Sequence, residues 1–447
     1  GATKVSKEFN EIDSFEYRCR LKPGLIPSPF ALAVNNTDYA KLIKTEFSHY
    51  DMLRKLEDKF IKWSPSIFIG YNSINFDEEF LRNSLFRALL DPYLTSKNNN
   101  NRADLLELLR TVDFFFPDTI NVPLNNKNKK TFKLDQIAPA NSINHLAHDA
   151  FGDVIATKQL AQLIFKRKPS FWLSFLEGAN KSLVYKVLSE EKIVFLCQTF
   201  YGKTTAISGT FLLSHPVYNF PVLFDLNYDP KELVELNLRD LKHVYTGGQK
   251  FLKFVKANKG PILLKKNQVE DSWFFNSINL NEFQKRSEIL ANATAFKQNL
   301  VSMLFDIAEE NQQEKELSGS QEDIMAEETL YSGGFPNNKD QKLKKEFKEE
   351  SWSSRYNICQ HFSDKRLSYF GLRLIYEECP EALPLSVRDK IESSVVNQLN
   401  SPNKEKWKTC DDFDKEIEII EKGSNTKVND FISELKDVRK YFEEIYS

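Results

Sequence analysis

The pattern of apolar and polar residues near the start of the chain predicts three strands. In Ser14–Lys22 the two kinds of residue alternate with a period of two, which is typical of a half-buried antiparallel strand. Ala2–Val5 predicts a shorter strand before it. Ile67–Ile69 is a continuous apolar run, which is typical of a strand buried on both faces.

Three segments of the same region show the helical spacing instead. Their apolar residues recur every three or four positions, as on a helix with one buried face. These segments are Ser48–Trp63, Asp77–Leu90 and Asp149–Phe165. Because strands and helices follow each other here, we expect a mixed α/β domain over residues 1–168.

The next part of the chain has a different character. Its β-rich runs are bounded by glycine and proline, and they predict a small barrel or sandwich. The runs are Lys192–Phe200, Thr204–Leu213, Phe220–Leu226 and Phe251–Leu264. Asn281–Gln313 then predicts one long helix, and the polar stretch Gln312–Glu328 predicts an exposed linker. We assign residues 169–327 to this second domain.

From Asn338 onward the spacing is helical, and we assign residues 328–447 to a third domain. Its expected core residues are Leu367, Phe370, Leu372, Leu374 and Ile375. A chain of 447 residues fits two or three domains. The predicted fold class is therefore α/β plus β plus α in a multidomain chain.

The cysteines and the apolar stretches of the sequence indicate in which compartment the protein is expected. Five scattered cysteines indicate neither a disulfide framework nor a zinc site. No stretch approaches the roughly 20 apolar residues that span a bilayer, and Gly1–Val5 does not open a signal peptide. We therefore expect a cytoplasmic protein with no membrane partner.

The formal net charge of −2 counts mildly against a nucleic-acid-binding protein. Charge is nevertheless segregated along the chain, because seven lysines lie between Leu241 and Lys266. They are Lys242, Lys250, Lys253, Lys256, Lys259, Lys265 and Lys266. Such a run is equally consistent with a solvated face or with a binding surface.

Two short patterns carry candidate chemistry. The first is Gly70–Asp77, with the sequence GYNSINFD, between a predicted strand and a predicted helix. A carboxylate at a helix start can hold a hard cation, and the helix N-terminus favours negative charge there. The alternative is that Asp77 is an ordinary acid of the first helical turn.

The second pattern is His148–Asp153, with the sequence HDAFGD, at the start of another predicted helix. Asp153 would ligate a metal ion, and His148 would take a proton from a metal-bound water, since imidazole titrates near neutral pH. The alternative is a capping acid and a surface histidine.

Together, and in this order, the two patterns resemble the second and third motifs of the DEDDh 3′→5′ exonucleases. The resemblance implies that Asp77 and Asp153 are two of four carboxylates that bind two Mg²⁺ ions, with Mn²⁺ as a substitute. It also implies that His148 is the general base. An exonuclease domain with the ribonuclease H-like fold and a mixed sheet would follow.

Further segments match the order found in bacterial exodeoxyribonuclease I along nearly the whole chain. They include Asp91–Tyr93, Phe132–Leu134, Val222–Leu226, Leu330–Phe335 and Phe362–Arg366. This resemblance implies a small Src-homology-3-like β-barrel as the second domain and a helical third domain. It implies hydrolysis of single-stranded DNA to 5′-mononucleotides, in DNA repair and recombination, by a bacterial monomer.

The same resemblance implies how the substrate is held. Lys133, Arg82 and Arg110 would contact the DNA backbone, and Tyr93 would stack on a base. The family's usual residue at position 133 is arginine, so Lys133 keeps the charge without the planar fork. From the lysine run we add Lys253, Lys256 and Lys259 as a candidate wall of the DNA channel. The C-terminal tail of single-stranded-DNA-binding protein is an expected partner.

The family's first motif, Asp-x-Glu, should lie upstream of the segment that matches Ala2–Val5, and this sequence does not contain it. Two-metal catalysis needs ligands for both ions. We therefore expect the 447 residues alone to be inactive or nearly so. Two alternatives stay open: a DEDDh exonuclease that acts on RNA ends, and a non-catalytic module that binds single-stranded DNA.

Overall fold

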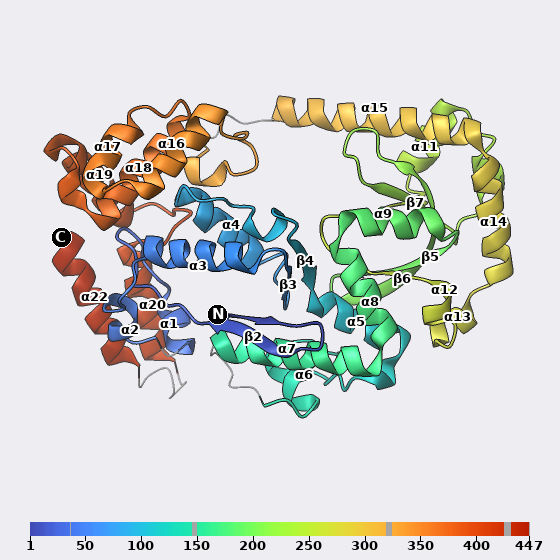
Figure 1. Ribbon diagram of the computed structural model, residues 1–447, viewed down its shortest axis with the longest axis horizontal. Coiled ribbons are helices and arrows are strands. Elements are labelled where there is room, and N and C mark those ends of the chain that lie inside the picture. Colours follow the sequence, from blue (N-terminus) through green and yellow to red (C-terminus); the bar gives the residue numbers. More distant parts are fainter. Residues whose placement is uncertain (36, 145–149, 319–323, 424–430, 447) are drawn as a thin grey trace.

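The computed structural model describes residues 1–35, 37–144, 150–318, 324–423 and 431–446 (Figure 1). Its N-terminal part contains two small sheets. One consists of the antiparallel strands β1 (Ala2–Val5) and β2 (Glu11–Phe15). The other consists of the parallel strands β3 (Ile67–Gly70) and β4 (Asn101–Asp104). The strands predicted at Ala2–Val5 and Ile67–Ile69 are thereby confirmed.

Helices surround these strands in the N-terminal part. They are α1 (Pro29–Val34), α2 (Tyr39–Ile43), α3 (His49–Trp63), α4 (Asp77–Arg87), α5 (Leu105–Phe115), α6 (Leu134–Ala140), α7 (Ala150–Arg167), α8 (Pro169–Ala179) and α9 (Lys181–Glu190). The three predicted helices correspond to α3, α4 and α7. Ser48 caps α3 by accepting a hydrogen bond from the Asp51 backbone amide.

Two expectations for the first domain are wrong. The single mixed sheet is replaced, among the described residues, by two separate pairs of strands. The β1–β2 hairpin packs through side chains instead, since Phe15 contacts Phe60 and Trp63 of α3. The strand predicted over Ser14–Lys22 ends at Phe15, because α2 and the residues beside it offer only isolated backbone bonds, such as Leu21 N to Leu42 O at 2.7 Å.

Five antiparallel strands form the sheet of the second region, in the order β8-β7-β6-β5-β9. Their bounds are β5 (Val194–Phe200), β6 (Lys203–Ser214), β7 (Pro221–Asp225), β8 (Leu252–Phe254) and β9 (Leu263–Leu264). The predicted Src-homology-3-like barrel is wrong in one respect: β8 and β9 lie at opposite edges and do not close a barrel within the described part of the chain.

The segment between β8 and β9 contacts both the sheet and the first region. Val255 and Ala257 pack in one core with Val194 and Leu223 of the sheet. The Asn258 carbonyl accepts a hydrogen bond from Arg102 of β4, at 3.2 Å. The Pro261 carbonyl lies so close to Gly178 of α8 that a Cβ there would be 1.9 Å from it. This segment therefore joins the sheet to β4 and α8.

The long helix predicted over Asn281–Gln313 is two helices, α14 (Leu280–Asn292) and α15 (Thr294–Ser318). The chain turns at Ala293, whose ψ of 69° is not helical. Figure 1 shows the two helices running along different edges of this region. Shorter helices complete it: α10 (Pro230–Leu233), α11 (Leu238–Thr246), α12 (Lys266–Val269) and α13 (Trp273–Ser277).

The third region is helical, as predicted. Its helices are α16 (Asn338–Glu349), α17 (Trp352–Cys359), α18 (Lys365–Glu378), α19 (Leu385–Leu399), α20 (Cys410–Lys422) and α22 (Ile432–Tyr446). Of the predicted core residues only Leu372 is half-buried, and the others are buried. In the described parts of the chain, no helix combines the length and the apolar character needed to cross a membrane.

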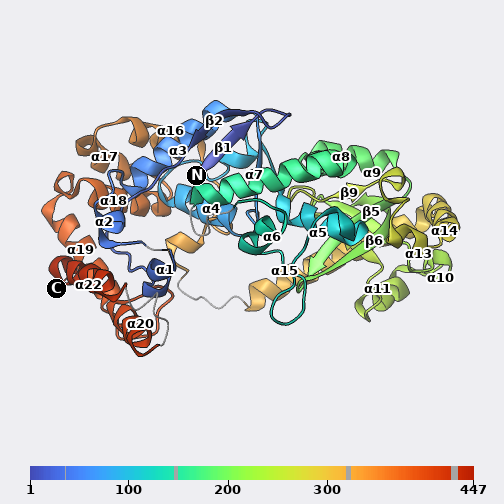
Figure 2. The same cartoon turned by 90° about the horizontal axis from the view of Figure 1, so that it is seen from below.

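Apolar cores join the three regions. The largest core runs from Phe9 to Leu304 and so crosses the boundary predicted after residue 168. A second core packs Leu85 of α4 with Phe370 of α18. A third packs Ile26 with Phe413 of α20. Figures 1 and 2 show the N-terminal part between the five-stranded sheet and the C-terminal helices. The domain boundaries themselves stay predictions.

His49, the first residue of α3, makes stability depend on pH. Burial, together with the smaller effects of the charges of Lys22 and Arg87, lowers the pKa of its imidazole from 6.5 to about 4. Between these values the unfolded chain binds a proton that the folded chain does not, so stability falls as the pH drops from 6.5 towards 4. Because of this group, we expect the free energy of unfolding to fall by about 2 kcal/mol between pH 7 and pH 5.

Urea unfolding at the two pH values tests this expectation. The variant His49→Gln should lose less stability on acidification than the unmodified protein. His243→Gln, at an exposed histidine of α11, is the matched control and should keep the original pH dependence. Equal pH dependence in the His49→Gln variant and the unmodified protein would contradict the assignment.

Candidate active site

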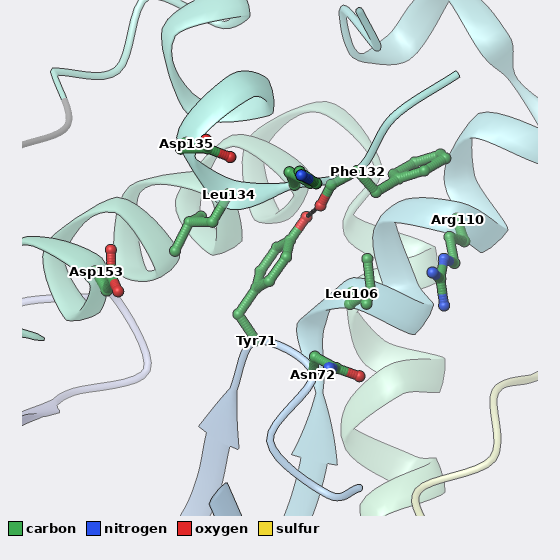
Figure 3. A pocket seen from close by; sticks show the side chains of 9 residues that line it. Tyr71, Asn72, Leu106, Arg110, Phe132, Leu134, Asp135 and Asp153 are labelled. Carbon is green, nitrogen blue, oxygen red and sulfur yellow. Dashed lines mark hydrogen bonds between the residues drawn. The ribbon is translucent and has the colours of Figure 1, made fainter. Parts of the chain in front are cut away.

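A cavity of about 540 Å³ opens where the ends of β3 and β4 meet α6 and α7 (Figure 3). Side chains from four separate stretches of sequence line it. They are Tyr71, Asn72, Leu106, Arg110, Phe132, Lys133, Leu134, Asp135 and Asp153. Two cations and two carboxylates therefore share one surface depression.

The loop that leaves β3 is held by a single buried carboxylate. Asp104, at the end of β4, accepts hydrogen bonds from the backbone amides of Asn72 (2.8 Å) and Ile74 (3.2 Å). It also caps α5 by accepting from Leu106 N. Burial raises the pKa of Asp104, although these three amides oppose the rise. The parallel pairing of β3 with β4 thus fixes the path of the chain into α4.

Asp77 is the first residue of α4, and Asp153 lies in the first turn of α7. Loss of solvation raises the pKa of the Asp77 carboxyl, and the charges of Glu78 and Asp153 raise it further. The two carboxylates are therefore close enough to repel each other. A divalent cation between such groups would relieve that repulsion, and oxygen ligands suit Mg²⁺.

The fit to a two-metal site is partial. Within the residues that the structure describes, no group of three or more His, Cys, Asp or Glu side chains is arranged to hold a metal ion. His148, the predicted general base, lies outside the described residues, so its position relative to Asp153 stays a prediction. Asp77 and Asp153 are thus the candidate ligands in the described part of the chain.

Lys133 and Arg110 lie at the same cavity, and their role as DNA contacts stays a prediction. Both line the cavity that Asp153 lines. Arg110 of α5 pairs with Glu107 at 2.6 Å, and its guanidinium lies 5.8 Å from the Phe132 ring. Lys133 immediately precedes α6. These two cations are placed to meet an anion that enters the cavity.

Tyr71 ties the segment that carries Lys133 to the end of β3. Its hydroxyl donates a hydrogen bond to the Phe132 carbonyl at 2.5 Å, which Figure 3 draws as a dashed line. Burial raises the pKa of the Tyr71 phenol, so it stays a hydrogen-bond donor at neutral pH. Asp135, which also lines the cavity, was not predicted as a site residue, although it lies in the first turn of a helix as Asp77 does.

Arg82 and Tyr93 lie elsewhere. The Arg82 side chain is largely buried, with its guanidinium 5.2 Å from the Tyr93 ring and its Nε 3.8 Å from Glu78. Tyr93 lines a second cavity, of about 320 Å³, between α4 and the C-terminal region. Lys344 and Phe335 line it as well. Their roles as DNA contacts stay predictions, at a distinct location from Arg110 and Lys133.

The lysine run is only partly available for binding. Lys253 pairs with Asp225 at 3.6 Å. Lys256 and Lys259 are exposed and have no ion-pair partner among the described residues. If this face contacts DNA, those two side chains carry the charge.

The chain is similar in sequence and in fold to known exonucleases. Residues 324–445 match the family model described as the Exonuclease I C-terminal domain. The chain is 30% identical over 317 residues to exodeoxyribonuclease I of Buchnera aphidicola subsp. Baizongia pistaciae. That alignment covers 68% of this chain and 65% of the relative, which is just under two thirds of its length.

Two solved structures are similar over almost the whole chain. E. coli exonuclease I in complex with a dA16 oligonucleotide has a TM-score of 0.77 at 21% identity, covering 99% of this chain and 94% of that one. A structure described as an ExoI/SSB-Ct complex has a TM-score of 0.75 at 21% identity, covering 100% and 94%. The resemblance to bacterial exodeoxyribonuclease I is thereby confirmed, in sequence over much of the chain and in fold along all of it.

Proposed function

We propose that the protein is a metal-dependent 3′→5′ exonuclease that hydrolyses single-stranded DNA to 5′-mononucleotides, in DNA repair and recombination. One observation carries this proposal. Two carboxylates lie at the starts of α4 and α7, the charge of Asp153 helps to raise the pKa of Asp77, and Asp153 lines a cavity with two cations. The similarity to exodeoxyribonuclease I supports the same reaction.

Each residue then has a defined task. Asp77 and Asp153 would hold Mg²⁺, or Mn²⁺ in its place, which when bound would polarise the scissile phosphate and the attacking water. Arg110 and Lys133 would bind phosphate oxygens and align the strand. His148 would accept the proton of the water as the new P–O bond forms. The bond from phosphorus to the 3′ oxygen of the preceding nucleotide breaks, and a 5′-mononucleotide leaves.

The described residues supply two carboxylates and no third ligand in metal-binding geometry. Two partners belong to the proposal: single-stranded DNA, and the C-terminal tail of single-stranded-DNA-binding protein. The oligonucleotide and SSB-Ct complexes of similar structures support them.

Incubating the protein with 5′-labelled single-stranded DNA, duplex DNA and RNA tests the function. We expect a ladder of shortened products on single-stranded DNA alone, in Mg²⁺ and not in EDTA. A ladder on RNA alone would overturn the DNA assignment in favour of an RNA exonuclease. Tight DNA binding without cleavage would favour a binding module.

A further inference from the structure

The loop of residues 329–336, which precedes α16, reaches from the C-terminal region to α4 of the N-terminal region (Figure 1). Leu330 anchors its start in the core that contains Phe86 of α4. The Tyr331 hydroxyl donates a hydrogen bond to Oε2 of Glu79 at 2.6 Å. It also accepts one, at 3.5 Å, from Nη1 of Arg82. The loop therefore touches the helix that begins at Asp77.

Arg366 of α18 holds this loop in shape. Its Nη1 donates to the Thr329 carbonyl at 3.0 Å, and its Nη2 donates to the Gly334 carbonyl at 3.1 Å. Because these carbonyls stand near the two ends of the loop, one guanidinium fixes the span between them. Its planar group of donors is suited to several acceptors at once, unlike a lysine ammonium.

The Arg366 guanidinium is itself fixed from two sides. Asp364 accepts from its Nε at 3.0 Å and from its Nη2 at 2.6 Å. Burial raises the pKa of the Asp364 carboxyl, but the hydrogen bonds and charge of Arg366 outweigh burial and leave that pKa lowered. The guanidinium also lies 5.6 Å from the Phe86 ring. Arg366 thus has one position, set by its own helix and by α4.

At Gly333 the loop backbone packs closely against the Arg366 side chain. A Cβ at residue 333 would lie 1.6 Å from Nη1 of Arg366. A methyl group there would displace the guanidinium or the loop. The glycine is therefore required for the contact, and a substitution at this position disturbs Arg366 without altering any charge.

On the basis of the proposed function, we propose that Arg366 and Tyr331 are positioning residues for single-stranded DNA: Arg366 shapes the loop, and Tyr331 holds Arg82 beside Tyr93. The connection continues to Tyr93, because the Arg82 guanidinium lies over its ring at 5.2 Å from the centroid. The Phe335 ring of the same loop lies 6.0 Å from Tyr93. The C-terminal region therefore sets the geometry of the side chains that would meet the strand away from Asp153.

Fluorescence anisotropy with a labelled single-stranded oligonucleotide in EDTA measures the affinity for DNA in the absence of hydrolysis. We expect Arg366→Ala and Gly333→Ala to weaken binding about 10-fold, the order of effect seen for residues that act on a binding site through their neighbours. Arg366→Lys should not restore binding, since one ammonium cannot span both carbonyls. Lys365→Ala is the matched control: it removes the same charge from an exposed neighbour and should bind as the unmodified protein does.

A double-mutant cycle separates positioning from general damage. Tyr331→Phe removes one hydroxyl and should weaken binding by itself, with little further loss when combined with Arg366→Ala. In assays of DNA hydrolysis, the variants should raise KM for DNA and leave kcat nearly unchanged.

Additive effects, an equal loss in kcat, or rescue by Arg366→Lys would overturn the inference. Tyr331→Phe keeps the test valid if Arg366→Ala fails to fold. Failure of the unmodified protein to bind DNA would instead contradict the proposed function, so the two failures are distinguishable.

Discussion

Replacing Asp153 by asparagine is expected to slow hydrolysis of single-stranded DNA by the protein more than about 100-fold. The substitution keeps the size of the side chain and removes the negative charge that a divalent cation needs. Loss of a group that merely orients a metal ligand already costs 10–100-fold, so loss of a ligand should cost more. The initial rate of shortening of a 5′-labelled oligonucleotide measures the effect, and Asp77→Asn should behave alike.

Two controls sharpen this expectation. Asp118→Asn, at an exposed acid outside the cavity, should leave the rate unchanged. Asp135→Asn removes a carboxylate from the cavity itself and should have a much smaller effect than Asp153→Asn. If Asp135→Asn is the more damaging of the two, the metal ligands have been assigned to the wrong acid. Isothermal titration with Mg²⁺ would show the loss of metal affinity directly.

Replacing Phe171 by alanine is expected to give the largest loss of stability, about 3–5 kcal/mol, because it leaves a cavity in a dense core. Phe171 of α8 is fully buried and packs against Phe115 at 6.1 Å and Phe116 at 5.6 Å between ring centroids. Its core continues into the five-stranded sheet. The damage should therefore reach both sides of the boundary predicted after residue 168.

Hydrogen exchange and urea unfolding check this result together. Amides of α5 and of β6 should lose protection in the same step. Tyr201→Ala, at a fully exposed aromatic in the β5–β6 turn, should change stability by less than about 0.5 kcal/mol. If β6 keeps its protection in the Phe171→Ala variant while α5 loses it, the two regions fold as separate units.

Local pattern was a reliable guide where a segment's own periodicity decides its structure. The amphipathic stripe in Ser48–Trp63 places α3 correctly, and the apolar run Ile67–Ile69 places β3. The two motif acids were predicted from their positions at helix starts, and the structure brings them into electrostatic contact. No long-range information is needed for such features, because neighbouring residues determine them.

Predictions failed for features that depend on which strands pair and on which neighbouring region a segment packs against. The β-rich runs were found, but their pattern does not show which strands pair, so the positions of β8 and β9 at opposite edges of the sheet were not predicted. Periodicity in Asn281–Gln313 continues past Ala293, since a single turn hardly disturbs it. Arg82 was predicted, like Arg110, to contact the DNA backbone. Sequence pattern could not show that its guanidinium lies beside Tyr93 and Tyr331 and not at the cavity of Arg110, and its role stays a prediction.

The amino-acid sequence alone was sufficient for the helical and β-rich character of each region, for the pair Asp77 and Asp153, and for the resemblance to exodeoxyribonuclease I. Only the tertiary structure decided which side chains share a cavity, that the sheet stays open, and that Arg366 organises a loop reaching α4. The physical reason is that periodicity and motifs depend on residues close in the chain. Shared cavities and interregional hydrogen bonds depend on residues hundreds of positions apart, such as Glu79 and Tyr331.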